Sequence, residues 1–414
     1  MNKEDFTRER KQPFVATLLL MLNMLRKSLA IEIDNFISHF QDGASCYSLK
    51  RLSTSAFIQN RKKISPEVFS YLSSVIIEGF YTEENTNVKH FMGFRVLAVD
   101  GSRITLPCTS KLKAHYGVAK NQSGVEIVQA RLSVLYDVQH KLVLDSSLSG
   151  LKTGERDLAL SHRAYWQKND LIICDRGYPS YDFILEHIKG GVDYLIRMKA
   201  NESNVVKEFV KSGKKSISTT LFPAQNQSFK EKGYTKESGL RIRLVRVDLP
   251  SGEIEILMTS LLDSQKYPSK IFKQLYFMRW GVEGFYDELK NKLKVEHFTG
   301  YSIQSIEQDV LCAIFISNIQ SVIVNDLQEE IKEQNKTRQY QYKVNTNLSY
   351  GFLKNRILEL LFKKAPLEQV FKELEELFLA HTVPIRNNRT NPREMNKYKA
   401  RVKPKVAKNQ KDAI

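Results

Sequence analysis

FRVLAVD, residues 94 to 100, reads as a buried β-strand that ends in a carboxylate. Its apolar run is short and unbroken, which is typical of a parallel strand covered on both faces. A second run of this kind, LIICD at residues 171 to 175, ends in Asp175 as the first ends in Asp100. Two apolar strands with aspartates at their exits predict an α/β fold in which two carboxylates meet at one edge of the sheet.

The segments around these two strands alternate between strand and helix patterns. The predicted elements are a hairpin of strands at 125–137 and 141–150, helices at 155–166 and 180–188, and a strand at 193–199. This order allows the strands that end at Asp100 and Asp175 to be neighbours in one sheet.

Further regions surround this α/β core. They are a helical N-terminal DNA-binding domain at 1–88, the first part of the core at 89–200, a β-rich insertion at 201–265, a catalytic helix region that completes the core at 266–310, a helical C-terminal region at 311–385 and a basic flexible tail at 386–414. Residues 51–76 read as two helices joined by a short turn. They form either a helix-turn-helix with Arg61, Lys62 and Lys63 facing phosphates or a plain helical hairpin.

The stretch LYFMRWGVEGFYDELKNKLK, residues 275 to 294, predicts one helix with a polar stripe. At about 100° per residue, Tyr276, Arg279, Glu283 and Lys290 fall within an arc of roughly 60°. Apolar residues occupy the neighbouring face at Met278, Val282, Phe285, Leu289 and Leu293. The stripe spans roughly 21 Å, which suits an extended polyanion better than a small substrate. The alternative is a solvated face with ordinary charge pairs.

The charge balance of the chain also favours a polyanionic partner. The 414 residues include 63 Lys and Arg against 46 Asp and Glu, a formal net charge of +17. Such an excess over a whole chain indicates nucleic acid as the commonest partner, although membrane-surface proteins share it.

The four cysteines and the apolar N-terminal run indicate a cytoplasmic protein. Cys46, Cys108, Cys174 and Cys312 are scattered and form no C-x-x-C pair, so neither a zinc site nor a disulfide framework is expected. The run from Phe14 to Leu25 is too short to span a bilayer and lacks a small-residue cleavage site. We therefore expect a buried helix and no membrane partner.

Three carboxylates together predict a metal site. Asp100 and Asp175 would repel each other when both are ionised, unless a divalent cation neutralises them. Mg²⁺ suits such a site, with Mn²⁺ as a substitute, and a pair of ions supports in-line displacement at phosphorus. Glu283 would be the third ligand. Asp287, one turn away on nearly the same face, is its rival, and Asp137, Asp145 and Asp170 also lie near strand ends.

The insertion contributes basic residues of its own. LRIRLVRVDLPSGEIEILMTS, residues 240 to 260, alternates around a Pro-Ser-Gly turn and predicts an antiparallel hairpin. Arg241, Arg243 and Arg246 lie on its first strand. We expect one face of the hairpin to pack while the other meets phosphate.

These residues resemble the DDE transposases of bacterial insertion sequences, in the family named after insertion sequence four. The resemblance rests on VDGS at Asp100, DRGY at Asp175, and the Y-x2-R-x3-E-x6-K spacing of Tyr276, Arg279, Glu283 and Lys290. It covers about residues 90 to 300 and selects Glu283 over Asp287.

The resemblance implies a ribonuclease H-like core with a β-rich insertion, and a cut-and-paste transposase in the bacterial cytoplasm near the nucleoid. Water would cleave a phosphodiester at the transposon end, the freed 3′-hydroxyl would form a hairpin, and the 3′ ends would join target DNA. Tyr276, Arg279 and Lys290 would contact end DNA, and Trp280 could stack on an extruded base. Because two ends must be brought together, we expect a dimer on double-stranded DNA.

Two other functions remain open at this stage. A host nuclease on the same core would use the same three carboxylates without needing the polar stripe. A domesticated DNA-binding protein would not need all three carboxylates. Terminal inverted repeats beside the gene would distinguish a transposase from both.

Overall fold

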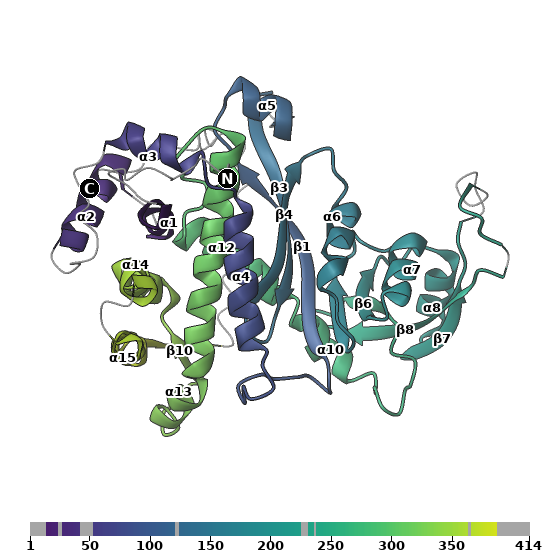
Figure 1. Cartoon of the computed structure of the whole chain (residues 1–414). Helices are drawn as coiled ribbons and strands as arrows, with labels where there is room; N and C mark the ends of the chain where they lie inside the picture. The colour runs from purple at the N-terminus through teal and green to yellow at the C-terminus, as the bar shows by residue number, and fades with distance from the viewer. Residues whose placement is uncertain are drawn as a thin grey trace. The chain divides into compact units, whose positions relative to one another are not determined.

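The fold was analysed in a computed structural model that describes residues 14–23, 27–41, 53–120, 124–224, 231–235, 237–362 and 366–386. The chain forms two compact units (Figure 1). The first comprises Met1–Asn87, Arg103–Ala130 and Asp287–Ile414, and the second comprises Val88–Ser102 and Arg131–Tyr286. The predicted basic tail lies outside the described residues apart from Arg386.

A mixed sheet forms the centre of the fold. Within the described residues it has nine strands in the order β2-β3-β1-β5-β6-β9-β8-β7, with β4 paired to β3. The strands are β1 (Arg95–Thr105), β2 (Val118–Lys120), β3 (Glu126–Asp137), β4 (Leu142–Gly150), β5 (Asp170–Cys174), β6 (Asp193–Met198), β7 (Ser216–Leu221), β8 (Leu240–Asp248) and β9 (Ile254–Thr259). The predicted α/β class and the hairpin of β3 and β4 are confirmed.

Strands β1, β5 and β6 form the parallel middle of the sheet. Their side chains are buried on both faces, as Val96, Leu97, Leu171 and Ile172 show at 0% exposure. This burial explains the unbroken apolar runs, because helices or loops cover both faces of a parallel sheet. The predicted neighbourhood of the strands that lead to Asp100 and Asp175 is confirmed.

The insertion extends this sheet. Strand β9 pairs antiparallel with β6, β8 with β9, and β7 with β8. The turn between β8 and β9 uses Gly252 at a φ of 84°, a conformation that favours glycine. The insertion thus supplies the antiparallel end of one sheet and also contains helix α8 (Asn204–Ser212).

Helices pack on the sheet within the second unit. They are α6 (Glu155–Ser161), the 3₁₀ turn η1 (His162–Tyr165), α7 (Tyr181–Lys189), α10 (Ile271–Phe277) and α11 (Trp280–Asp287). Helix α10 buries Phe272 and Leu275 against Val96, Leu195 and Leu257 of three strands. This packing places the segment after α10 beside the sheet that carries Asp100 and Asp175.

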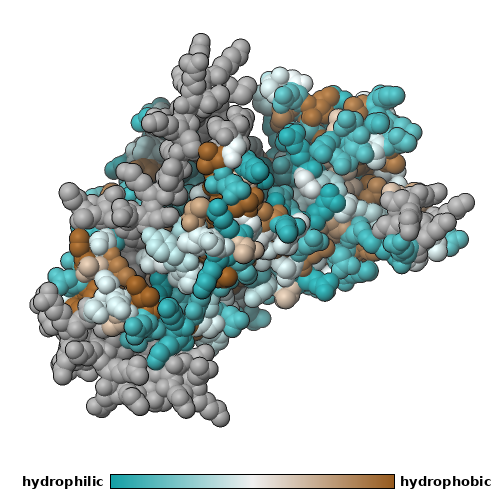
Figure 2. All heavy atoms as spheres, turned by 90° about the horizontal axis from the view of Figure 1, so that it is seen from above, coloured by the Kyte–Doolittle hydropathy of each residue, from teal (hydrophilic) through white to brown (hydrophobic). Residues whose placement is uncertain are grey.

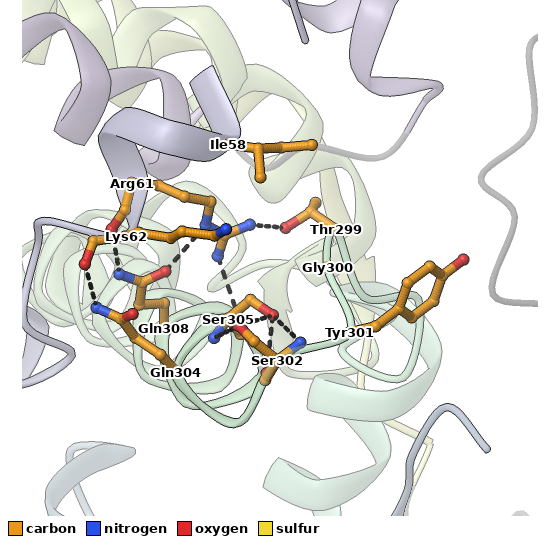
Figure 3. Close-up of a pocket in the computed structure, with 10 residues that line it drawn as sticks. All are labelled: Ile58, Arg61, Lys62, Thr299, Gly300, Tyr301, Ser302, Gln304, Ser305 and Gln308. Carbon is orange, nitrogen blue, oxygen red and sulfur yellow. Dashed lines mark hydrogen bonds between the residues drawn. The ribbon is translucent and has the colours of Figure 1, made fainter. Parts of the chain in front are cut away.

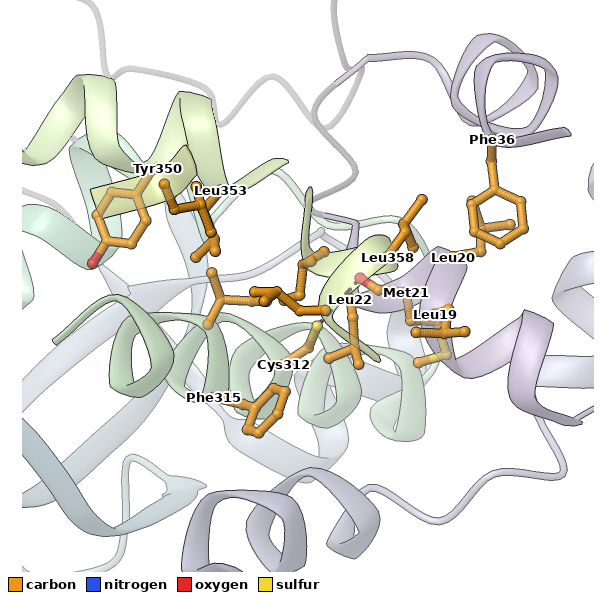
Figure 4. Close-up of a cluster of buried hydrophobic side chains, with 14 of the residues drawn as sticks. Leu19, Leu20, Met21, Leu22, Phe36, Cys312, Phe315, Tyr350, Leu353 and Leu358 are labelled. Carbon is orange, nitrogen blue, oxygen red and sulfur yellow. Dashed lines mark hydrogen bonds between the residues drawn. The ribbon is translucent and has the colours of Figure 1, made fainter. Parts of the chain in front are cut away.

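The first unit is largely helical. Its elements are α1 (Phe14–Leu22), α2 (Leu29–Gln41), α3 (Thr54–Arg61), α4 (Glu67–Phe80), α5 (Ser110–Tyr116), the turn η2 (Glu288–Lys292), α12 (Ile303–Asp326), α13 (Gln328–Gln334), α14 (Thr346–Phe362), α15 (Leu367–Ala380) and the two-stranded pair β10 (Tyr342–Val344) and β11 (Thr382–Pro384). Side chains of α1, α2, α12 and α14 meet in one apolar core (Figure 4). The predicted buried helix at the apolar N-terminal run is confirmed by α1.

Helix α12 is the core helix of this unit. Its 24 residues have the length and mean hydropathy to cross a membrane, but 67% of the apolar window is buried inside the protein. It packs against α4 and α1, and burial of this kind is typical of the central helix of a globular unit.

The surface mixes hydrophilic and hydrophobic residues. The face in Figure 2 shows hydrophobic residues in small separate areas among hydrophilic ones. Isolated exposed apolar side chains are normal on proteins and need no special explanation. Phe277 and Trp280 are of interest because they lie on the segment that leads to Glu283.

Candidate active site

Asp100 and Asp175 follow the paired parts of two adjacent parallel strands. Strand β1 pairs with β5 from Arg95 opposite Asp170 to Ala98 opposite Ile173. Asp100 and Asp175 each come two residues after the last of these pairs, and Asp175 lies just past the end of β5. Strand β1 continues to Thr105, so the expectation that it ends at Asp100 is wrong. The parallel pairing brings both aspartates next to the carboxyl end of β5.

The third carboxylate follows a break in the predicted helix. Helix α10 ends at Phe277 and α11 begins at Trp280. The 3₁₀-type bonds from Arg279 N–H to the Tyr276 carbonyl (3.1 Å) and from Val282 N–H to the Arg279 carbonyl (3.1 Å) tighten the turn between them. After Asp287 the chain continues as one π-helical turn, η2. The expectation of one continuous helix is therefore wrong.

Two physical causes explain this break. Glycines at positions 281 and 284 lower the helix propensity of the segment. In addition, Gly281 packs against the end of β3 and the residue after it, since a Cβ atom placed there would lie 3.7 Å from Tyr136 Cε1 and 3.6 Å from Val138 Cβ. The turn buries Arg279, which is 4% exposed, and leaves Phe277 and Trp280 exposed at 70% and 49%.

Tyr286 anchors α11 to the sheet. Its hydroxyl lies 2.8 Å from the Asp100 carbonyl oxygen and 3.0 Å from the Leu132 carbonyl oxygen. The Phe285 ring packs on Tyr136 of β3, with centroids 5.2 Å apart. Sequence reasoning missed Tyr286, although its position three residues after Glu283 on a helix was available as an indication.

Arg279 and Glu283 form an ion pair across this turn. Arg279 Nη2 donates to Glu283 Oε1 at 2.7 Å, and the guanidinium carbon lies 5.2 Å from the centre of the Trp280 ring. Arg279 Nε is buried and has no hydrogen-bond partner among the described residues. Glu283 is thus held by a cation from its own segment.

Tyr276 orients the second aspartate. Its hydroxyl donates to Asp175 Oδ1 at 3.0 Å. Burial raises the pKa of Tyr276 above its usual value, so the hydroxyl stays protonated and remains a donor to the carboxylate.

The charges of the three carboxylates act on one another. The pKa of Asp100 is raised to about 6, mostly by burial and in smaller part by the charges of Glu283 and Asp175. The Gly101 N–H, which donates to Asp100 Oδ1 at 2.8 Å, and the Arg279 charge both oppose this rise. Mutual repulsion of this kind marks a place where a cation would be stabilising.

These residues fit a divalent metal in their chemistry. Three carboxylates offer the hard oxygen ligands that Mg²⁺ and Mn²⁺ take. Among the described residues, no three acidic, histidine or cysteine side chains are already close enough to enclose an ion. Arg279 occupies one oxygen of Glu283, so Glu283 would have to leave this partner to bind metal.

The rival acids at strand ends all have structural partners. Asp137 is buried and pairs with His140 at 2.8 Å, and Asp170 is buried and pairs with Arg95 at 2.7 Å. Asp287 is exposed and accepts from Asn291 at 2.6 Å. Within the described part of the chain, none of these three side chains contacts Asp100, Asp175 or Glu283 through a hydrogen bond or an ion pair.

Asp145 belongs to a hydrogen-bonded chain with a serine and a histidine. His162 Nδ1 lies 2.7 Å from Asp145 Oδ2, and His162 Nε2 lies 2.9 Å from the Ser133 hydroxyl. Ser133 and His162 are buried at 2% and 0% exposure, so no substrate reaches the hydroxyl. This arrangement braces β3, β4 and η1.

Comparison with known proteins identifies the family. Residues 92–319, more than half of the chain, match the family described as "Transposase DDE domain". This chain belongs to the transposase DDE domain family. The matched region contains Asp100, Asp175 and Glu283 together with the whole insertion.

Individual relatives are distant. The "Transposase InsG for insertion sequence element IS4" of Escherichia coli (strain K12) is 21% identical over 284 residues, which are 68% of this chain and 63% of that protein. The chain thus spans somewhat less than two thirds of that relative. A solved structure, "Cryo-EM structure of piggyBac transposase synaptic complex with hairpin DNA (SNHP)", aligns with 93% of this chain and 78% of its own at 10% identity and a TM-score of 0.42.

The fourth residue of the motif lies in the other unit of this transposase. Lys290, on η2, donates to the Arg103 carbonyl at 2.8 Å, and burial lowers its pKa. Asp100, Asp175, Tyr276, Arg279 and Glu283 all lie in the second unit. The structure thus places these five motif residues in the second unit and Lys290 in the first.

The three insertion arginines differ in burial. Arg241 is exposed, whereas Arg243 is 1% exposed and donates to the carbonyls of Leu261 (3.3 Å) and Tyr267 (2.7 Å). The expectation that Arg243 faces phosphate is therefore wrong, because its guanidinium holds the loop after β9. Arg246, of opposite parity on the strand, pairs with Asp248 at 2.8 Å.

Arg61 of the predicted helix-turn-helix is also buried. It lines a pocket of about 240 Å³ in the first unit and points inward, towards Thr299 and Gln308 (Figure 3). Its guanidinium pairs with Asp309 at 2.9 Å and donates to Gln308 Oε1 at 2.9 Å. The alternative in which Arg61 faces phosphate is therefore wrong, while Lys62 beside it is exposed.

Proposed function

We propose that this chain cuts DNA at the ends of its insertion sequence and joins the freed 3′ ends to target DNA. The observation that carries the proposal is the position of Asp100 and Asp175 two residues beyond the last paired positions of two adjacent parallel strands, with Glu283 on a helix whose Tyr286 hydroxyl bonds the Asp100 carbonyl. Membership of the DDE transposases supports the reaction class. The sheet with α11 beside it is compatible with a ribonuclease H-like core.

Asp100, Asp175 and Glu283 would hold Mg²⁺, or Mn²⁺ in its place, as a pair of ions. When bound, the metal would polarise the phosphodiester and lower the pKa of the attacking water or hydroxyl. The protein itself supplies rigid positions for the carboxylates. Tyr276 orients Asp175 through its hydrogen bond, and Tyr286 fixes the backbone at Asp100.

Arg279 would change partner during the reaction. In this structure its guanidinium neutralises Glu283. Once Glu283 serves as a metal ligand, the same guanidinium becomes available to a DNA phosphate, and its unpaired Nε adds a donor. A buried, fork-shaped donor suits phosphate held beside the reacting bond.

Aromatic and basic side chains outside the three carboxylates would bind the rest of the DNA. Trp280 and Phe277 offer exposed rings on which a base extruded at a hairpin end could stack. Lys290, Arg241 and Arg246 would contact phosphates. Since two transposon ends must be joined, the active form would be a dimer on DNA, located in the cytoplasm at the nucleoid.

Cleavage of a duplex that carries the terminal inverted repeat flanking the coding sequence tests the proposal. The parent chain should cleave it in Mg²⁺ or Mn²⁺. Asp100→Asn and Asp175→Asn should bind the duplex but cleave it at least 10³-fold more slowly, about 4 kcal/mol in the barrier. Asp287→Asn is the matched control and should cleave normally. Full activity of either site variant, or no cleavage by the parent, would refute the proposal.

The dimer is tested separately by sizing the complex that completes strand transfer. A complex with one chain and one DNA end that joins target DNA would contradict the dimer. The sizing is independent of the metal proposal, because it is made on complexes already shown to be active.

A further inference from the structure

Arg131 and Glu155 form an ion pair against both backbone segments that carry the aspartates. Arg131 lies on β3, Glu155 begins α6, and the pair is 3.5 Å apart between Nη2 and Oε1. A Cβ atom placed on Gly101 would lie 3.8 Å from Glu155 Cγ and 4.0 Å from Arg131 Cγ. A Cβ atom placed on Gly177 would lie 3.8 Å from Glu155 Oε2. The ion pair therefore lies within contact distance of Gly101, which follows Asp100, and of Gly177, two residues after Asp175.

The guanidinium of Arg131 has more donors than partners. It carries five N–H groups, and within the described residues its recorded hydrogen bond runs from Nη1 to the Thr153 carbonyl. At 3.5 Å the contact with Glu155 is too long for a good hydrogen bond. The Arg131 side chain is 13% exposed, and none of its nitrogens is among the buried atoms that lack a partner in the described part of the chain. Its contact with Glu155 is weak, so the guanidinium can bind an anionic ligand without losing a good hydrogen bond.

The neighbouring cations are placed differently. Arg279 is buried and bound to Glu283 at 2.7 Å. Arg156 and Arg176 are exposed on the same border, and Arg156 Nε donates to the Gly177 carbonyl at 3.4 Å. Arg131 thus differs from Arg279 in its longer contact with a carboxylate, 3.5 Å against 2.7 Å, and from Arg156 and Arg176 in being largely shielded.

The electric field of Arg131 reaches the catalytic side of the sheet. Burial raises the pKa of Tyr178, the negative charges of Asp100 and Glu155 raise it further, and the Arg131 charge lowers it. Arg131 therefore acts on Tyr178 with the opposite sign to Asp100 and Glu155.

We propose that Arg131 binds a backbone phosphate of the DNA strand that is cut, and that Glu155 is the positioning residue that holds its guanidinium ready. The inference rests on the proposed function, since it identifies the phosphate as one next to the cleaved bond. A planar guanidinium binds phosphate through two parallel N–H bonds. The long contact to Glu155, whose side chain is 49% exposed, leaves the guanidinium free to exchange the carboxylate for this phosphate.

Arg131→Met removes the charge and keeps most of the volume. Single-turnover cleavage of the terminal-repeat duplex should fall by roughly 10- to 100-fold, the loss of one or two charge-assisted hydrogen bonds. Thermal stability should stay close to that of the parent, because the ion pair with Glu155 is long and partly exposed. Arg131→Lys should fall between parent and Met, and Glu155→Gln should slow cleavage in the same direction by less. Arg163→Met, which removes an exposed arginine paired with Glu186, is the matched control and should cleave normally.

Methylphosphonate substitutions locate the contact. A set of duplexes, each with one uncharged methylphosphonate near the cleaved bond, is cleaved by the parent and by Arg131→Met. We expect one position that slows the parent and leaves Arg131→Met unaffected, since the two changes remove the same bond.

Three outcomes would overturn the inference. Parent-like cleavage by Arg131→Met would do so, and so would multiplicative effects at every substituted phosphate, which indicate a structural role. Unfolding of both Arg131 variants would also show a structural role. If the parent itself fails to cleave, the proposed function falls first and this inference with it.

Discussion

Arg279 donates to Glu283 at 2.7 Å across one turn, and the arginine is buried while the carboxylate is partly exposed. A carboxylate expected to bind metal is thus neutralised by a cation of its own segment. Arg279 and Glu283 are therefore paired with each other when no metal is bound. Binding of metal by Glu283, or of phosphate by Arg279, would compete with this ion pair.

The pair predicts a coupled effect on stability and cleavage. Glu283→Gln should abolish cleavage by at least 10³-fold, and it should destabilise the fold by about 1–3 kcal/mol because a buried guanidinium loses its charged partner. Arg279→Met in the same chain should restore much of that stability without restoring cleavage. Urea unfolding of the two single variants and the double variant measures the coupling. Additive losses in the double variant would show that the pair is energetically unimportant.

Lys290 and Arg279 should differ in the salt dependence of DNA binding. Lys290→Ala should reduce the slope of log binding constant against log salt by about one, as expected for one lost phosphate contact. Arg279→Ala should reduce this slope only with metal present. Without metal, the Arg279 guanidinium is paired with Glu283 and is not available to a phosphate. Binding to the terminal-repeat duplex is measured across a salt series with and without Ca²⁺, which occupies carboxylates without supporting a fast reaction. Unchanged slopes for both variants would favour the solvated-face alternative.

Substitutions of Arg241 and Arg243, both on β8, should have different effects, one on DNA binding and the other on stability. Arg243→Met should lower the free energy of unfolding by about 2–4 kcal/mol, because it leaves the carbonyls of Leu261 and Tyr267 without their donor. Arg241→Met, two residues away and exposed, should leave stability within about 0.5 kcal/mol and weaken DNA binding. Urea unfolding and end binding are compared for the two variants. A stable Arg243→Met, or unaltered DNA binding by Arg241→Met, would contradict the respective assignment.

His187 predicts a loss of stability in mild acid. Burial lowers the pKa of His187 to about 4 from an ordinary value near 6.5, so the unfolded chain binds the proton more readily. The stability linked to neutral His187 is present above pH 6.5 and is lost as the pH falls from 6.5 towards 4, up to about 3 kcal/mol.

His187→Leu should remove this pH dependence. Urea unfolding of parent and variant at pH 7, 5.5 and 4.5 isolates the histidine, because the buried carboxylates that titrate in the same range are common to both chains. The two curves should converge as the pH falls. A constant difference between parent and variant at all three values would rule out His187 as the titrating group.

The sequence by itself determined which strands lead to the aspartates, and its element order allowed these strands to be neighbours, as the structure shows them to be. Unbroken apolar runs before Asp100 and Asp175 require burial on both faces, and only a parallel middle strand meets that requirement. The motif spacing also separated Glu283 from Asp287. The apolar runs and the motif spacing can be recognised in the sequence because they depend only on residues close together in the chain.

Only the tertiary structure decided how the remaining charged side chains are used. Arg61, Arg243 and Arg279 look like surface cations in the sequence, yet each is buried on partners 4 to 248 positions away in the chain. Sequence reasoning missed Arg131, although a single arginine among the apolar residues of β3 is an unusual feature that the sequence itself contains. Burial of a charge depends on which distant groups fold around it, and local sequence patterns carry no record of those groups.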